Sequence, residues 1–239
     1  KCCNTIIKKY KSNMIWDDKG FLISKFKYNE NSLIADFFTL NHGRCSGIIF
    51  GATSNKIKGY LQIGNLFQLN CTLKNESKIG SFKIEIINPI TPIFFNNRKK
   101  LHCITAAMSM IKILTAENQK NHEIFKIIND LFVILKNENW IKNYILWELN
   151  LLKLVGYDLE LKKIVNKESK NDKIEYFVEN SNTKKFVPAF LIETNNKNIE
   201  ISELLNGFKL VTNYLEKNIL IPNNINQPIQ RTDFINLLK

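Results

Sequence analysis

The sequence predicts an α+β protein in which a five-stranded β-barrel is followed by a mainly helical domain. Up to Ile87, short apolar segments with the period of two that marks β-strands alternate with polar turns. From Arg98 onward, apolar residues recur at the spacing of about 3.6 that marks α-helices. Two prolines interrupt the strand pattern between these regions. We therefore predict a barrel domain over residues 14–90 and a helical domain over residues 96–239.

The barrel is expected to contain a meander of three strands followed by two strands with strict alternation. The expected strands are Phe21–Phe26, Leu33–Leu40, Cys45–Phe50, Leu66–Leu73 and Ile79–Ile87. Gly20, Gly43 and Gly47 lie at or inside the first and third strands, where glycine allows a sheet to bend and close. This pattern is typical of a small barrel of the oligonucleotide-binding (OB) type, and a barrel of the SH3 type is the nearest alternative.

Apolar stripes at helical spacing predict the helices of the second domain. The expected helices include Leu101–Ile111, Ile124–Leu135, Trp140–Val155 and Leu204–Leu215, with a short last helix over Arg231–Leu238. The helix Trp140–Val155 is apolar on several sides, which predicts a central position. Residues 157–173 are polar and rich in lysine, so we expect an exposed loop there. The segments Ile174–Val178 and Lys185–Val187 predict a small β-hairpin inserted in this domain.

The first thirteen residues differ in character from the rest of the chain. They lack a long apolar segment and a small-residue cleavage site, so they do not form a secretory signal. We predict that residues 1–13 are a disordered extension and that the native protein starts at Met14. No apolar run reaches the roughly 18 residues needed to cross a membrane, so no membrane partner is expected.

The five cysteines show no spacing that is typical of a metal site or of a disulfide framework. Cys45, Cys71 and Cys103 lie in apolar segments, and we expect them to be buried thiols. An odd number of cysteines without a framework fits a reducing compartment. No cofactor is expected.

The net charge of +12 is compatible with a polyanionic partner. The basic residues are spread along the whole chain, however, and the chain is also rich in asparagine and isoleucine, which indicates a coding bias. The charge alone therefore favours nucleic-acid binding no more than it favours an ordinary solvated surface.

Short motifs in a fixed order resemble the RecO family of DNA repair proteins. The motifs of the barrel domain are W-x-D-x-G-F at Trp16–Phe21, N-E at Asn29-Glu30, F-T-x-x-H-G-R at Phe38–Arg44, G-I-I-x-G-A at Gly47–Ala52 and L-Q-I-G-N at Leu61–Asn65. In the second domain the resemblance includes W-E-L at Trp147–Leu149 and the segment LKLVGYDLEL at Leu152–Leu161. Some members of the family carry four cysteines that bind zinc, but Lys162–Lys173 contains none, so no metal is expected here.

The resemblance implies a recombination mediator in the bacterial cytoplasm, associated with the nucleoid. Such proteins bind single- and double-stranded DNA and anneal complementary strands that are coated by single-strand-binding protein. They work with a RecR-like protein to load a recombinase. The resemblance also suggests that the helical domain holds the acidic, hydrophobic tail of single-strand-binding protein in a groove with an apolar floor and a nearby cation.

Basic side chains of the barrel and of the domain junction are the candidates for phosphate contacts. The predicted DNA-binding residues are Lys25, Arg44, Lys56, Lys58, Arg98 and Lys99. Arg44 matches a basic position after the turn glycine of the family, and a guanidinium there can pair with a phosphate. The alternative for each of them is an ordinary solvated side chain, and Lys100 at the junction is ambiguous in the same way.

Aromatic residues of the barrel could stack on bases, and Tyr28 and Tyr60 are the candidates because both lie in turns. Nine other aromatic residues are expected in the two cores. They are Phe26, Phe37, Phe38, Phe50, Phe67 and Phe82 in the barrel, and Trp140, Tyr144 and Trp147 in the helical domain.

Two other functions are compatible with the sequence. One is an RNA-binding barrel protein, and the other is a protein–protein adaptor with a purely structural barrel. An enzyme is the least favoured class, because no metalloprotease, nucleophile-elbow, Walker A or dinucleotide motif occurs. The acidic pair Asp17-Asp18 points to opposite sides of a strand, so we expect solvated acids there and no metal ligands.

Overall fold

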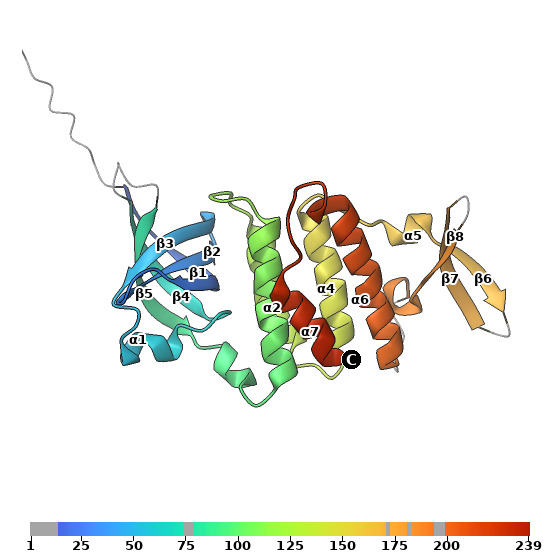
Figure 1. The fold of residues 1–239 in the computed structure, drawn as a ribbon, viewed down its shortest axis with the longest axis horizontal. Coiled ribbons are helices and arrows are strands. Elements are labelled where there is room, and N and C mark those ends of the chain that lie inside the picture. The colour runs from blue at the N-terminus through green and yellow to red at the C-terminus, as the bar shows by residue number, and fades with distance from the viewer. Residues whose placement is uncertain (1–13, 74–78, 171–172, 181–182, 194–198) are drawn as a thin grey trace, which may run out of the picture.

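The computed structural model describes residues 14–73, 79–170, 173–180, 183–193 and 199–239, and the predicted extension over residues 1–13 lies outside these ranges. Three parts follow one another along the long axis of the molecule (Figure 1). A β-barrel stands at one end, a layer of helices forms the middle, and a small sheet stands at the other end. The predicted α+β architecture is confirmed.

Five strands form the barrel in the order β1-β2-β3-β5-β4, with β1 paired to both β2 and β4. Their bounds are Met14–Lys27 for β1, Ser32–Thr39 for β2, Gly43–Phe50 for β3, Leu66–Leu73 for β4 and Gly80–Asn88 for β5. The short helix α1, Asn55–Tyr60, lies between β3 and β4. This strand order is that of the OB barrel, as expected, and not that of the SH3 alternative.

A β-bulge in β1 reverses the sides to which its side chains point. Leu22 pairs with Phe37 and Ser24 pairs with Asp36, so Ile23 is an extra residue without a partner. Before the bulge, even-numbered residues face the barrel interior. After it, even-numbered residues face outward.

This reversal corrects the prediction for Phe26. The simple alternation of β1 places Phe26 in the core, but its side chain is 49% exposed. Lys25 instead points toward the mouth of the barrel, where its ammonium group donates to the backbone oxygen of Leu61.

Packed aromatic rings fill the barrel interior. Phe37 makes edge-to-face contacts with Phe67 and Phe82, at centroid distances of 5.7 and 5.4 Å. A Cβ atom on Gly47 would lie 2.4 Å from the ring of Phe82, so only glycine fits there. The predicted burial of these rings is confirmed. Phe50 was expected beside them but is 64% exposed, because the odd-numbered residues of β3 face inward.

The second domain consists of helices around a buried centre. Its helical elements are the 3₁₀ helix η1 (Thr91–Phe94), α2 (Arg98–Leu114), α3 (His122–Ile134), α4 (Trp140–Leu154), α5 (Leu161–Ile164), η2 (Ala189–Leu191), α6 (Ile201–Leu215), the π-helical turn η3 (Glu216–Leu220) and α7 (Ile229–Leu238). Tyr144 and Trp147 of α4 are buried, which confirms the predicted central position of this helix, and Trp140 at its start is also largely buried. The indole of Trp147 donates to the backbone oxygen of Ile127, at 2.7 Å.

The small sheet has one strand more than the predicted hairpin. Its strands are β6 (Asn166–Lys170), β7 (Lys173–Asn180) and β8 (Thr183–Val187), in the order β6-β7-β8. The expectation of a loop over residues 157–173 is therefore wrong, since α5 and β6 lie there. The sequence of β6, NKESK, has no apolar alternation, and its strand conformation comes from pairing with the edge of β7.

The barrel and the helices share apolar and polar contacts. Phe21, on the outer face of β1, packs against Phe125 and Phe132 of α3, at centroid distances of 5.0 and 5.9 Å. The side chain of Asn65 is fully buried; it donates to the backbone oxygen of Tyr60 at 2.8 Å and accepts from the backbone amide of Thr91 at 2.9 Å. Asn65 therefore joins the end of α1 to the start of η1.

Candidate nucleic-acid interface

The predicted DNA-binding residues do not lie together. Three of them lie at one end or the other of α2, whereas Lys25, Lys56 and Lys58 lie on or beside α1. This helix has 17 residues and is about 25 Å long at 1.5 Å per residue. Arg44 lies beside its last turn, at Thr115, whereas Arg98 and Lys99 form its first turn. One continuous surface along a single edge therefore does not include all six residues.

Arg44 is tied to the segment after α2. Its Nε donates to the backbone oxygen of Thr115 at 3.0 Å, and its Nη1 lies 3.1 Å from a carboxylate oxygen of Glu117. The backbone amide of Asn118 donates to the carbonyl of Arg44 at 2.8 Å. The Arg44 side chain is only 16% exposed. These contacts make Arg44 a link between the barrel and the helical domain.

A second link was missed by sequence reasoning. The ammonium group of Lys112 lies 2.7 Å from Asp36 and donates to the hydroxyl of Ser24 at 2.9 Å. Asp36 also accepts from Ser24 and from Ser46, at 2.5 and 2.6 Å. Burial alone would raise the pKa of Asp36, but these hydrogen bonds outweigh burial and keep its pKa below the ordinary value. No local sequence signal joins residues so far apart in the chain.

At the mouth of the barrel, Lys25 and Lys58 come close together. Burial and the positive charge of Lys58 lower the pKa of Lys25. Lys25 is partly buried, whereas the Lys58 side chain on α1 is exposed. Lys56 belongs to the same helix, but its side chain lies outside the described part of the structure. Two of the predicted cations are thus brought together here.

Arg98 and Lys99 form the exposed first turn of α2. Asn97 caps the helix by accepting from the backbone amide of Lys100 at 3.1 Å, and the first turn contains no acidic residue. Positive charge at the N-terminus of a helix opposes the helix dipole, so these side chains do not stabilise α2. Lys100 is different, because its ammonium group lies 5.9 Å from the ring centre of Trp140.

The cations of α1 and of the α2 start lie toward the same edge of the molecule. Figure 1 shows α1, the connection through η1 and the first turn of α2 along the lower edge. The buried Asn65 side chain connects the segments that carry them. We call Lys25, Lys58, Arg98 and Lys99 the lower-edge cations. Within the described residues, no ion pair joins Lys58, Arg98 or Lys99 to an acidic side chain.

His42 and Asp18 form a structural cluster at the β2–β3 turn. His42 Nδ1 lies 2.8 Å from Asp18 Oδ2, and the imidazole stacks on Trp16 at a centroid distance of 4.0 Å. Asp18 also accepts from the backbone and side-chain amides of Asn41. Asp18 is buried, which corrects the expectation of a solvated acid, while Asp17 is exposed as predicted. Among the described residues, no group of His, Cys, Asp and Glu could hold a metal ion.

The cysteines that the structure describes are buried free thiols, as predicted. Burial raises the pKa of Cys45 to about 12 and that of Cys71 to about 11, and the pKa of Cys103 is also raised by burial. These three side chains are therefore neutral at physiological pH and are poor nucleophiles.

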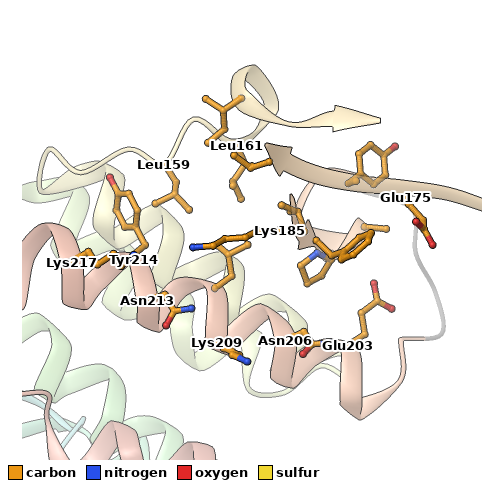
Figure 2. A pocket seen from close by; sticks show the side chains of 18 of the residues that line it. Leu159, Leu161, Glu175, Lys185, Glu203, Asn206, Lys209, Asn213, Tyr214 and Lys217 are labelled. Carbon is orange, nitrogen blue, oxygen red and sulfur yellow. The ribbon is translucent and has the colours of Figure 1, made fainter. Parts of the chain in front are cut away.

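A groove of about 820 Å³ lies between the small sheet and α6. We call it the sheet groove. Its apolar lining includes Leu159, Leu161, Tyr176, Val178 and Val187. Figure 2 shows Lys185 reaching into the groove from the sheet side, while Lys209 and Lys217 come from α6 and η3. Glu175 and Glu203 lie at the opposite end of the groove from Lys217 (Figure 2).

The barrel topology and the exposed cations define the class of OB-barrel proteins, whose members commonly bind oligonucleotides. The family profile "Recombination protein O N terminal" matches residues 14–90, and "Recombination protein O C terminal" matches residues 96–217. The chain belongs to the RecO family of DNA repair proteins.

Curated relatives extend over nearly the whole chain. "DNA repair protein RecO" of Rickettsia canadensis is 30% identical over 219 residues, which are 87% of this chain and 90% of the relative. The protein of the same name from Bartonella bacilliformis is 24% identical over 95% of this chain and 97% of its own length. In the described ranges, no helix has both the length and the apolar character that a membrane crossing needs.

Proposed function

We propose that this DNA repair protein acts without catalysis, by binding single- and double-stranded DNA and annealing complementary strands. The observation that carries the proposal is the group of lower-edge cations. Lys58, Arg98 and Lys99 are exposed, and no acidic partner among the described residues neutralises them. Arg98 and Lys99 also stand where positive charge costs helix stability, which favours a role outside the fold.

The mechanism is electrostatic. The lower-edge cations neutralise the phosphates of two strands, so that the strands approach each other with less repulsion. Base pairing itself then tests the sequence, because phosphate contacts carry no sequence information. Arg44 is a weaker candidate than the sequence suggests, since Glu117 already neutralises it. It reaches a phosphate only if the Glu117 contact opens.

The proposed partners are a RecR-like protein, single-strand-binding protein and, indirectly, a recombinase. For the tail of single-strand-binding protein we propose the sheet groove, which combines the apolar floor and the cations that such a tail requires. The terminal carboxylate would lie near Lys185, Lys209 and Lys217, and the apolar side chains would lie on the floor.

Strand annealing is the experiment that tests the proposed function. Two complementary strands coated with single-strand-binding protein are mixed with the protein, and duplex formation is followed at several salt concentrations. We expect the protein to accelerate annealing and its DNA affinity to fall steeply as salt rises. Unchanged affinity between low and high salt would overturn the electrostatic mechanism. Metal-dependent strand cleavage would overturn the proposal of a non-catalytic protein.

The sheet groove is tested with an acidic peptide that ends in an apolar residue and a free carboxylate. We expect Lys209→Glu and Lys217→Glu to weaken binding, and we expect an amidated peptide to bind weakly to the unchanged protein. Lys126→Glu, an exposed charge reversal on α3, is the matched control. Equal binding of the free and amidated peptides would remove the proposed carboxylate contact.

The same groove also supports the adaptor function, in which the barrel is structural. An adaptor would bind the peptide but would show no affinity for DNA at any salt concentration. An RNA-binding barrel protein would prefer RNA when single-stranded RNA and DNA of the same sequence compete. Both outcomes differ from the result expected for an annealing protein.

A further inference from the structure

Three aromatic side chains are exposed on one face of the barrel. Phe26, Tyr28 and Phe50 are 49%, 56% and 64% exposed, although the sequence predicts two of them in the core. We call these three residues the aromatic platform. Isolated exposed apolar residues are common on protein surfaces and need no explanation. Three aromatic rings on one face are a different case if they are neighbours.

The strand register shows that they are neighbours. Phe26 pairs with Ile34, and Ile34 pairs with Ile48, so these three side chains form one row across β1, β2 and β3. The next row is formed by Tyr28, Ser32 and Phe50, because Ser32 pairs with Phe50 and its carbonyl accepts from the amide of Tyr28 at 3.0 Å. Two rows on one side of a strand are about 6.8 Å apart, and strands are about 4.8 Å apart.

The bulge at Ile23 creates this arrangement. Without the extra residue, Phe26 would point into the barrel and Lys25 would point outward. With it, Phe26 and Tyr28 face outward beside Phe50. The exposure of the Phe26 ring removes apolar area from the core, so it does not help the barrel to pack.

The helical domain covers the rest of this face but leaves the platform open. Phe38, two rows before Ile34, is fully buried against the helical domain. Lys112 marks the limit of the covered part, because it pairs with Asp36 and its ammonium group lies 5.7 Å from the ring centre of Phe26. The platform is the uncovered remainder of the face.

We propose that the aromatic platform stacks the unpaired bases of single-stranded DNA. The proposal rests on the proposed DNA-binding function and adds a base contact that the phosphate contacts do not supply. Flat exposed rings beside cations are the combination that binds single strands without sequence preference. The cation beside the platform is Lys112, whose ammonium group lies 5.7 Å from the ring centre of Phe26.

Single-strand affinity of substituted proteins tests the platform. The probes are a fluorescent oligo-dT strand, an abasic strand of the same length and a duplex, and fluorescence anisotropy measures each affinity. We expect Tyr28→Ala with Phe50→Ala to weaken oligo-dT binding about 10-fold or more, since losing one base stack corresponds to roughly 5- to 150-fold. The affinities for the duplex and the abasic strand should change by less than about 2-fold, because neither offers an unstacked base.

Matched variants separate stacking from general surface effects. Phe186→Ala removes a ring that is also 64% exposed, on β8 of the small sheet, and should leave oligo-dT binding unchanged. Phe50→Trp keeps a flat ring and should retain affinity, whereas Phe50→Leu keeps apolar area without a flat ring and should not. Because these side chains are exposed, we expect every variant to melt within a few degrees of the parent protein.

The outcomes distinguish the platform from the underlying function. If the parent protein binds none of the three probes, the proposed function fails together with the platform. If the parent binds them but Tyr28→Ala with Phe50→Ala binds oligo-dT equally well, only the platform is overturned. Equal losses on all three probes would also overturn it. Loss of binding to a protein partner, with oligo-dT affinity unchanged, would replace it by a protein-docking surface.

Discussion

The two ends of α2 hold similar cations in opposite situations. At the C-terminal end, Arg44 donates to the carbonyl of the capping residue Thr115, and Lys112 of the last turn pairs with Asp36. At the N-terminal end, Arg98 and Lys99 are exposed and no acidic residue lies in the first turn. Cations stabilise the C-terminus of a helix and destabilise its N-terminus.

The difference teaches how to assign a role to a basic residue in a chain that is basic throughout. A cation that meets a carboxylate or a helix C-terminus contributes to folding, whereas one that opposes the dipole without a partner is available to a ligand. Arg231 is the extreme case of a cation that contributes to folding. It is fully buried, and its guanidinium makes two bonds of 2.9 and 2.8 Å to the buried Glu148.

The largest effect is expected from breaking the buried pair. Arg231→Met leaves Glu148 as an uncompensated buried charge, which should lower the free energy of unfolding by about 3–5 kcal/mol in urea denaturation. The double variant with Glu148→Met has no charge left at this site and should recover most of this loss. If Arg231→Met alone were as stable as the parent protein, the assignment of Arg231 to folding would be wrong.

The next effect concerns the cations without partners. Replacing Lys58, Arg98 and Lys99 together by alanine should reduce the slope of log affinity for duplex DNA against log salt by about 2.7, or about 0.9 per lost phosphate contact. The unfolding free energy should stay the same or rise slightly. Arg44→Met is the contrasting variant, and its salt slope should equal that of the parent. If Arg44→Met changed the salt slope more than the triple variant did, Arg44 would be the phosphate contact and the cations without partners would not be.

A smaller effect is expected at the link between the barrel and α2. Lys112→Met removes a charged hydrogen-bond donor from the buried Asp36, and we expect a loss of about 2 kcal/mol in unfolding free energy. Lys99→Met, on the first turn of the same helix, should cause no measurable loss. Equal losses for both variants would show that the position along α2 does not decide the role.

The smallest effect is a pH dependence. Asp36 and Asp18 both have pKa values below the ordinary 3.8, because hydrogen bonds to each carboxylate outweigh its burial. A carboxyl with a lowered pKa in the folded state adds stability that is fully present above pH 3.8 and is lost as pH falls through the folded-state pKa. Asp36→Asn should therefore lose less stability than the parent between pH 5 and pH 2, while Asp18 keeps part of the dependence.

The order of strands and the long helices could be predicted from the sequence, because alternation and helical stripes are local patterns. The buried side of β1 beyond Ile23 could not, since a bulge leaves no mark in the pattern of residue types. Phe50 was assigned to the core for its residue type, although its position in β3 points outward. The strand β6 depends on its pairing with β7 and has no pattern of its own.

The candidate site was predictable as a set of basic residues but not as a set of contacts. Lys25, Lys58, Arg98 and Lys99 could be named in advance because they follow turns, strands and a domain junction. Whether a cation has a partner depends on residues far along the chain. Glu117, which neutralises Arg44, is 73 positions away from it, and sequence reasoning had no means of pairing them.

The buried amide of Asn65 has a consequence for the DNA contact that we propose. Because it joins the carbonyl of Tyr60 to the amide of Thr91, the lysine on α1 and the basic first turn of α2 cannot change their separation independently. A single strand adapts to such a fixed spacing at little energetic cost. A duplex, with a persistence length of about 150 base pairs, does not bend as easily. The rigidity of this one junction would then set the preference between the two forms of DNA.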